Sequence, residues 1–334
     1  MKMNEIPSSP NEQMLPYIKK RRSPLAKIVL LMSVAAIVIG CGVTLANKLG
    51  GENFFSKLFG AAKATSSSAT KSTETTAEKN IYDFDVSSVP KGQHGIIPAD
   101  LSCAAVGYDY VGGDGNIAVS ADTSFTFQNG KIQVLIVNTH PYEAYTDEIS
   151  ASYGDDFSAV GGDKTVKELA QSMTLALAEK GIGTEYLDTG VTSNKNSYAE
   201  AKKKISEYLK DHTDILYIID IHRDVLTDGG ENLLRPITKH GDVVCAQMNF
   251  TVSKSAKNYE SNLLLAAALA EKIKQISPSV LMPTEITGSV QNQDLAKAVV
   301  TLNIGTCGNS FSEASESAKL FTEALAFLAA GEER

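Results

Sequence analysis

From about residue 95 onward, short apolar runs alternate with segments that place apolar residues at helical spacing. Strands are predicted over 132–137, 184–187, 215–221, 243–252 and 299–304, and helices over 164–181, 197–209, 258–276 and 312–329. The Asn129-Gly130 pair between two apolar runs also predicts a hairpin over 125–136. Strands separated by helices of this length favour right-handed crossovers. The pattern therefore predicts an α/β fold with a mainly parallel sheet flanked by helices.

A second kind of apolar pattern lies near the N-terminus. Residues 28–46 carry no charge, and a helix of that length rises about 28 Å, roughly the hydrocarbon thickness of a bilayer. Residues 1–27 hold six basic and two acidic side chains. The positive-inside rule then predicts a cytoplasmic N-terminus, one transmembrane helix over 28–47, and a C-terminal part outside the membrane. A cleaved secretory signal and a lipoprotein modified at Cys41 are the alternatives.

The segment after this span has no apolar period. Residues 61–80 are dominated by Ser, Thr, Ala and Lys, which is typical of a solvated linker. The chain therefore divides into a basic tail (1–27), a membrane span (28–47), a low-complexity, disordered linker (48–94) and a folded domain (95–332).

Charge and cysteine content exclude some functions. The chain has 31 basic and 39 acidic residues and a net charge of −8, which argues against a nucleic-acid-binding protein. Four widely spaced cysteines form neither a zinc knuckle nor a disulfide framework, so free, buried thiols are expected in the folded part.

Residues that could bind a metal ion lie directly after two of the predicted strands. His140 follows the strand 132–137, and Glu143 comes three residues later. His222 directly follows the strand 215–221. Because parallel strands end at the same edge of a sheet, these side chains are expected to lie close together. Two imidazoles and a carboxylate form a three-ligand zinc set with an open fourth position, as in catalytic sites. Hydrogen-bonded structural histidines are the alternative.

Charged residues on either side of His222 extend this candidate site. Asp220 and Asp224 are predicted to orient the imidazole from outside the metal's ligand set. Arg223 is predicted to hold a substrate carboxylate or to pair with one of these aspartates. The remaining histidines, His94, His212 and His240, are expected at the surface.

Several motifs in sequence order resemble the stage II sporulation protein P family, the zinc amidases of peptidoglycan in endospore-forming bacteria. The resemblance covers residues 82–328. It rests on NTHPYEAY (138–145), DIHRD (220–224), NYESNLLLAAALAEKI (258–273) and NQDL (292–295), together with the order of basic tail, span, tether and C-terminal domain.

The resemblance implies that His140, Glu143 and His222 hold Zn²⁺. It also implies a departure, because Asn303 stands where the family has the glutamate that acts as general acid/base. Asparagine cannot exchange a proton with water at neutral pH. Glu285 and Asp294 are the carboxylates considered as substitutes.

The resemblance further implies cleavage of the amide between N-acetylmuramic acid and L-alanine during septal wall remodelling and engulfment. The implied partners are peptidoglycan and stage II sporulation proteins D and M. A catalytically impaired wall-binding or scaffold protein is the main alternative, and a zinc peptidase acting on the stem peptide is a third.

Overall fold

The computed structural model describes residues 80–84, 94–107, 125, 127–147, 157–193, 195–230 and 232–330. The predicted membrane span and most of the predicted linker lie outside these ranges. Among the described residues, no helix has the length and apolar character needed to cross a membrane. The hydroxyl of Tyr82 donates a hydrogen bond to the carbonyl of Ile237 at 3.1 Å. Residues 80–84, within the predicted linker, are thus part of the folded unit.

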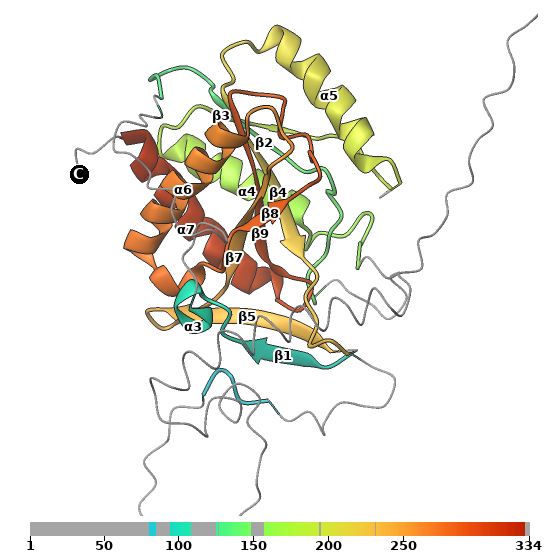
Figure 1. Cartoon of the computed structure of the whole chain (residues 1–334), viewed down its shortest axis with the longest axis vertical. Coiled ribbons are helices and arrows are strands. Elements are labelled where there is room, and N and C mark those ends of the chain that lie inside the picture. Colours follow the sequence, from blue (N-terminus) through green and yellow to red (C-terminus); the bar gives the residue numbers. More distant parts are fainter. Residues whose placement is uncertain are drawn as a thin grey trace, which may run out of the picture. The chain divides into compact units, whose positions relative to one another are not determined.

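A six-stranded sheet forms the centre of this unit (Figure 1). Its order is β3 (Thr184–Leu187), β2 (Val134–Val137), β4 (Tyr217–Asp224), β9 (Ala298–Thr306), β7 (Met248–Ser253) and β8 (Glu285–Thr287). The first four strands are parallel to one another, whereas β7 runs antiparallel to β9 and parallel to β8. The sheet is therefore mixed, and the prediction of a mainly parallel sheet is wrong for β7 and β8.

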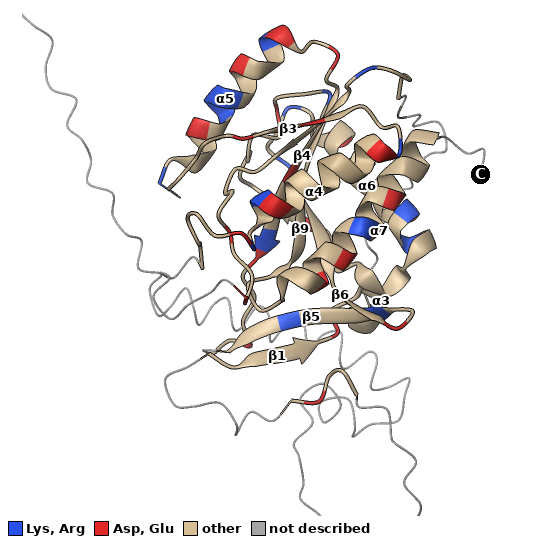
Figure 2. Ribbon diagram, turned by 180° about the vertical axis from the view of Figure 1, so that it is seen from behind, with Lys and Arg blue, Asp and Glu red and all other residues tan. Residues whose placement is uncertain are grey.

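Helices lie on both faces of the sheet, as predicted. The large apolar core lies under α4 (Val166–Glu179), α6 (Tyr259–Ile276) and α7 (Phe311–Ala330). On the other face, α5 (Ser197–Asp211) covers a smaller cluster that includes Leu135 and Ile218. Charged residues are spaced along α5 (Figure 2). The smaller cluster also includes Val299, so α5 covers the part of this face formed by β2, β4 and the start of β9.

A second, three-stranded sheet was not predicted. It consists of β1 (Ile96–Ala99), β5 (Leu233–His240) and β6 (Val243–Ala246), and the short helices α3 (Cys103–Val106) and η2 (Pro278–Val280) lie near it. The strand predicted over 243–252 is divided between the two sheets at Gln247. The Gln247 side chain accepts a hydrogen bond from the Leu101 backbone at 2.7 Å, which fixes the division.

The predicted hairpin over 125–136 is absent from the described residues of that segment. A turn does form, because Lys131 N–H donates to the Gln128 carbonyl and Gly130 has φ +77°. The strand before it does not form, since β2 already pairs with β3 on one side and β4 on the other. A strand with two occupied edges has no place for a hairpin partner.

Candidate metal centre

The turn after β2 and the end of β4 bring the three predicted ligands together. Val137 and Asp220 are register partners on these parallel strands, so residues 140 and 222 leave the same edge of the sheet. A turn closes where the Glu143 N–H donates to the His140 carbonyl at 3.2 Å. Asn138 fixes this turn to β4, because its amide donates to the Ile221 carbonyl at 2.7 Å.

The two imidazoles face one carboxylate. His140 Nδ1 lies 3.5 Å from Glu143 Oε1, and His222 Nδ1 lies 3.2 Å from Glu143 Oε2. The two rings are perpendicular, with centroids 5.1 Å apart. One donor atom from each residue lies within 4.8 Å of the others. A divalent ion coordinated by two imidazoles and a carboxylate at about 2 Å fits this separation after small side-chain movements.

The outward-facing nitrogen of each imidazole also has a polar neighbour. His140 Nε2 lies 2.7 Å from Ser197 Oγ, and His222 Nε2 lies 3.1 Å from Asp220 Oδ1. Thr139 fixes the Asp220 carboxylate through its N–H at 2.8 Å and its hydroxyl at 2.6 Å. The hydrogen bond with Ser197 can fix the tautomer of His140 that leaves Nδ1 free to bind a metal, and the Asp220 carboxylate places a negative charge beside His222.

At this site, burial and neighbouring charges shift the pKa values of Glu143 and His222 in opposite directions. Burial raises the pKa of Glu143, but the charge of His222 and hydrogen bonds from both imidazoles outweigh it and hold the pKa well below its usual range. Burial lowers the pKa of His222, but the carboxylates of Asp220 and Glu143 raise it well above its usual value. The site therefore has enough negative charge to stabilise a cation, which is what a divalent metal requires.

Replacing Asp220 with asparagine is expected to weaken zinc binding by about 10–100-fold, the usual cost of losing an outer-shell carboxylate. The variant keeps the side-chain shape but removes the anion that faces His222 Nε2. Zinc affinity can be measured by competition with a chromogenic chelator. An unchanged affinity would show that Asp220 only supports the Thr139 turn, and Asp188→Asn serves as an exposed control.

The other predicted site residues lie beside the ligands in different roles. Arg223 is buried, and its guanidinium donates to the carbonyls of Ala144 at 3.1 Å and Phe157 at 3.0 Å. Its backbone N–H donates to Glu143 Oε2 at 3.1 Å. Arg223 thus holds the loop that carries Glu143. The Asp224 carboxylate accepts the Val225 N–H at 2.7 Å, and burial raises its pKa.

Asn303 lies on β9 next to the metal centre. It is the register partner of His222, it is buried, and its amide donates to Thr251 Oγ1 at 3.1 Å. Glu285 lies on β8 beyond Thr251, whereas Asp294 pairs with Lys202 at 3.2 Å.

Sequence reasoning did not find two residues of α5 that contact the site. Ser197 bonds His140, and the Tyr198 ring packs edge-on against the His140 ring with centroids 5.2 Å apart. Neither belongs to a motif, and only the fold places the start of α5 beside the turn after β2. Of the other histidines, His94 and His240 are exposed, while His212 is half-buried and stacks on Tyr208.

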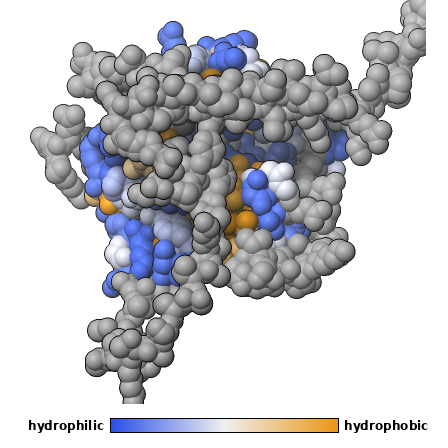
Figure 3. Space-filling model, turned by 60° about the horizontal axis from the view of Figure 1, so that its bottom comes forward, coloured by the Kyte–Doolittle hydropathy of each residue, from blue (hydrophilic) through white to orange (hydrophobic). Residues whose placement is uncertain are grey.

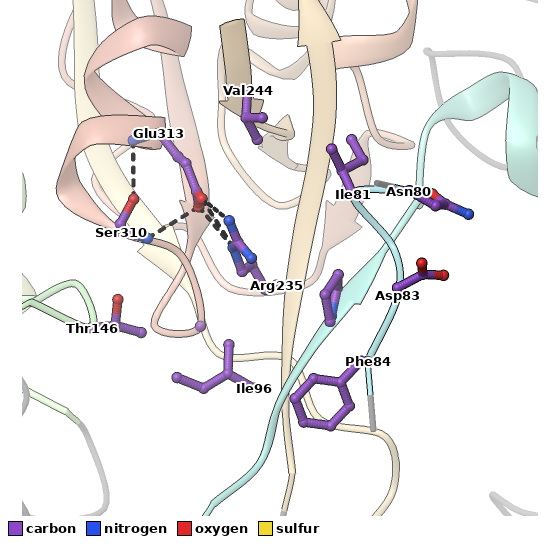
Figure 4. Close-up of a pocket in the computed structure, with 12 residues that line it drawn as sticks. Asn80, Ile81, Asp83, Phe84, Ile96, Thr146, Arg235, Val244, Ser310 and Glu313 are labelled. Carbon is purple, nitrogen blue, oxygen red and sulfur yellow. Dashed lines mark hydrogen bonds and ion pairs between the residues drawn. The ribbon is translucent and has the colours of Figure 1, made fainter. Parts of the chain in front are cut away.

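A separate cavity of about 630 Å³ lies between residues 80–84, the second sheet and the start of α7 (Figure 4). Within it Arg235 forms an ion pair with Glu313, and Glu313 and Ser310 exchange hydrogen bonds that cap α7. Apolar residues are exposed on this side of the molecule (Figure 3). None of the predicted site residues lines this cavity, so its polar groups serve to fix the start of α7.

Comparison with known proteins places these observations in a family. The family model for Stage II sporulation protein P (SpoIIP) matches residues 52–326. Stage II sporulation protein P of Bacillus subtilis (strain 168) is 28% identical over 207 residues, which are 57% of this chain and 50% of the relative. The chain thus spans about half the length of this curated relative.

Solved structures match at lower similarity. The N-acetylmuramyl-L-alanine amidase Ami1 from Mycobacterium smegmatis has 12% identity and a TM-score of 0.37, covering 61% of this chain and 100% of that one. The CwlD amidase from Clostridioides difficile, in complex with the GerS lipoprotein, has 12% identity and a TM-score of 0.36, covering 60% and 95%. The family match, which extends over most of the chain, shows that this protein belongs to the stage II sporulation protein P family.

Proposed function

We propose that this protein is a zinc-dependent peptidoglycan hydrolase that cleaves the amide between N-acetylmuramic acid and L-alanine. The observation that carries the proposal is the cluster of His140, Glu143 and His222, whose donor atoms lie within 4.8 Å of one another. Family membership supports a role in sporulation. The septal wall during engulfment is the proposed place of action, and stage II sporulation proteins D and M are the proposed partners.

Each residue of the site has a separate role in the proposed reaction. Zinc held there would polarise the scissile carbonyl and lower the pKa of a water molecule. Ser197 and Asp220 hold the two imidazoles in orientation, and Arg223 holds the Glu143 loop. The proposal also places the chain in the cell membrane, with a span over 28–47, a cytoplasmic N-terminus and the catalytic domain outside. With this topology the catalytic domain lies on the outer side of the membrane, where the peptidoglycan is.

Digestion of purified sacculi by the zinc-loaded full-length chain tests this function. We expect soluble stem peptides with a free L-alanine amino terminus and glycan strands with free lactyl groups, both identified by mass spectrometry. A chelator should stop the release, and added zinc should restore it. Fragments cut within the stem would instead indicate a peptidase. No release from intact or soluble substrates, with zinc bound, would contradict hydrolysis.

A second candidate function is a wall-binding or scaffold protein that retains the metal centre and lacks turnover. Asn303 favours it, because this residue lies beside His222 and cannot exchange protons with the reacting groups. Sedimentation of the chain with sacculi, without release of fragments, is the result that this candidate predicts.

A further inference from the structure

The loop that carries Glu143 is held in place by a second segment, residues 157–166, which we call the clamp segment. The Ala144 N–H donates to the Phe157 carbonyl at 3.1 Å, and an isolated β-bridge joins Glu143 to Ser158. Three further backbone hydrogen bonds join the two segments, from Ala159 to Tyr142, from Tyr145 to Lys164, and from Val166 to Glu143. The position of the Glu143 backbone therefore depends on the clamp segment.

Phe157, the first residue of the clamp segment, has a left-handed backbone with φ +51°. Glycine and asparagine adopt this conformation readily, whereas it is unfavourable for a residue with a bulky side chain. Such a conformation persists where the surrounding contacts over-determine it, and it is often found at functional sites. At Phe157 these contacts are two donors to one carbonyl oxygen, the Ala144 N–H and Arg223 Nη2, the latter at 3.0 Å.

Both donors to the Phe157 carbonyl belong to residues that hold Glu143. Ala144 is its neighbour in the chain, and Arg223 Nε donates to the Ala144 carbonyl at 3.1 Å. The Arg223 backbone N–H donates to Glu143 Oε2, also at 3.1 Å. The Phe157 ring instead packs edge-on against the ring of the exposed His94, with centroids 5.9 Å apart. The backbone of Phe157, and not its ring, is thus connected to the metal ligand.

We propose that Phe157 is a positioning residue whose left-handed backbone holds the Glu143 carboxylate in place to bind the metal ion. This inference rests on the metal centre of the proposed function. If the Phe157 backbone left this conformation, its carbonyl would turn away, and the Ala144 N–H and the buried Arg223 guanidinium would each lose an acceptor. Since Arg223 also holds Glu143 Oε2, the carboxylate would lose its fixed position. The apparent Kd for zinc rises as the fraction of molecules with the carboxylate in place falls.

Substitutions of Phe157 in the full-length chain separate the backbone conformation from the ring. Asparagine and valine are similar in size and both remove the ring, but of the two only asparagine tolerates a left-handed backbone. We expect Phe157→Asn to bind zinc as tightly as the wild type and Phe157→Val to bind it about ten-fold more weakly, the effect of the strain of one left-handed residue. Zinc affinity is measured by competition with a chromogenic chelator. Co²⁺ bound in place of zinc should give the wild-type visible spectrum in Phe157→Asn and an altered one in Phe157→Val, because the spectrum depends on ligand geometry.

Gly241→Val is the matched control for backbone strain alone. Gly241 lies in the exposed turn between β5 and β6 and has φ +62°, and a Cβ atom added there meets no atom within 4 Å. Valine at this position imposes a similar strain in the second sheet, outside the metal centre. It should lower the urea concentration at which the chain unfolds and leave the Kd for zinc unchanged.

Equal zinc affinity in Phe157→Asn and Phe157→Val, or a loss in Gly241→Val as large as that in Phe157→Val, would overturn this inference alone. If circular dichroism shows that Phe157→Val does not fold, Phe157→Ala takes its place, since alanine also disfavours the left-handed conformation and occupies less space. A wild-type chain that binds no zinc would overturn the proposed function as well.

Discussion

Replacing His222 with alanine is expected to reduce the zinc content of the purified chain from about one ion per chain to nearly none. His222 supplies one of three donors, and a carboxylate with a single imidazole binds zinc far more weakly than a complete three-ligand set. Release of stem peptides from sacculi should fall with the metal, below the limit of detection. Zinc content is measured by atomic absorption after dialysis against a weak chelator.

The design must separate loss of metal from loss of fold. His222 is 5% exposed, and removing it takes away the imidazole that lies between the carboxylates of Asp220 and Glu143. His140→Ala is the gentler variant, because that side chain is 18% exposed and lies on the turn after β2. His212→Ala is the control, since His212 stacks on Tyr208 away from the site. Zinc retained by a folded His140→Ala variant would contradict the metal centre.

The cluster of His140, Glu143 and His222 could be predicted from the sequence because the ends of neighbouring parallel strands lie close together in space. His140 and His222 are far apart along the chain, but each follows a buried apolar strand, and β2 and β4 are parallel neighbours. Correct strand assignments were therefore enough to predict that these side chains lie close together. Ser197 and Tyr198 could not be found in this way, because helix α5 reaches the site through packing that no periodicity encodes.

The mixed direction of the strands could not be predicted from the sequence, for a different reason. The run over 243–252 looks like one strand, but Gln247 ends β6 in the small sheet and lets β7 begin in the large one. A polar residue within an apolar run was the signal for this break. The direction of β7 depends on the β5–β6 hairpin that precedes it, and an apolar pattern contains no information about direction. The predicted hairpin over 125–136 is absent for a similar reason. Strand pairing depends on the whole sheet, and a local apolar pattern does not contain that information.

The second large expected effect is on kcat, and it follows from the position of Asn303 beside His222. Asn303→Glu is expected to raise kcat for release of stem peptides by about 10²–10⁴-fold, the usual contribution of a general acid/base. The new carboxylate would lie beside His222, where it can take a proton from the attacking water and return it to the leaving amine. Thr251, which now accepts from the Asn303 amide, can instead donate its hydroxyl to the carboxylate.

Asn303→Gln is the matched control for this gain, because it has the length of glutamate and cannot ionise. We expect Asn303→Gln to remain at the wild-type rate while both variants bind zinc equally. A rate increase in Asn303→Glu alone would mean that the natural protein has an assembled metal site without an efficient proton carrier. Equal rates in all three proteins, with muropeptide release well above background, would contradict this and would mean that proton transfer uses a group other than residue 303.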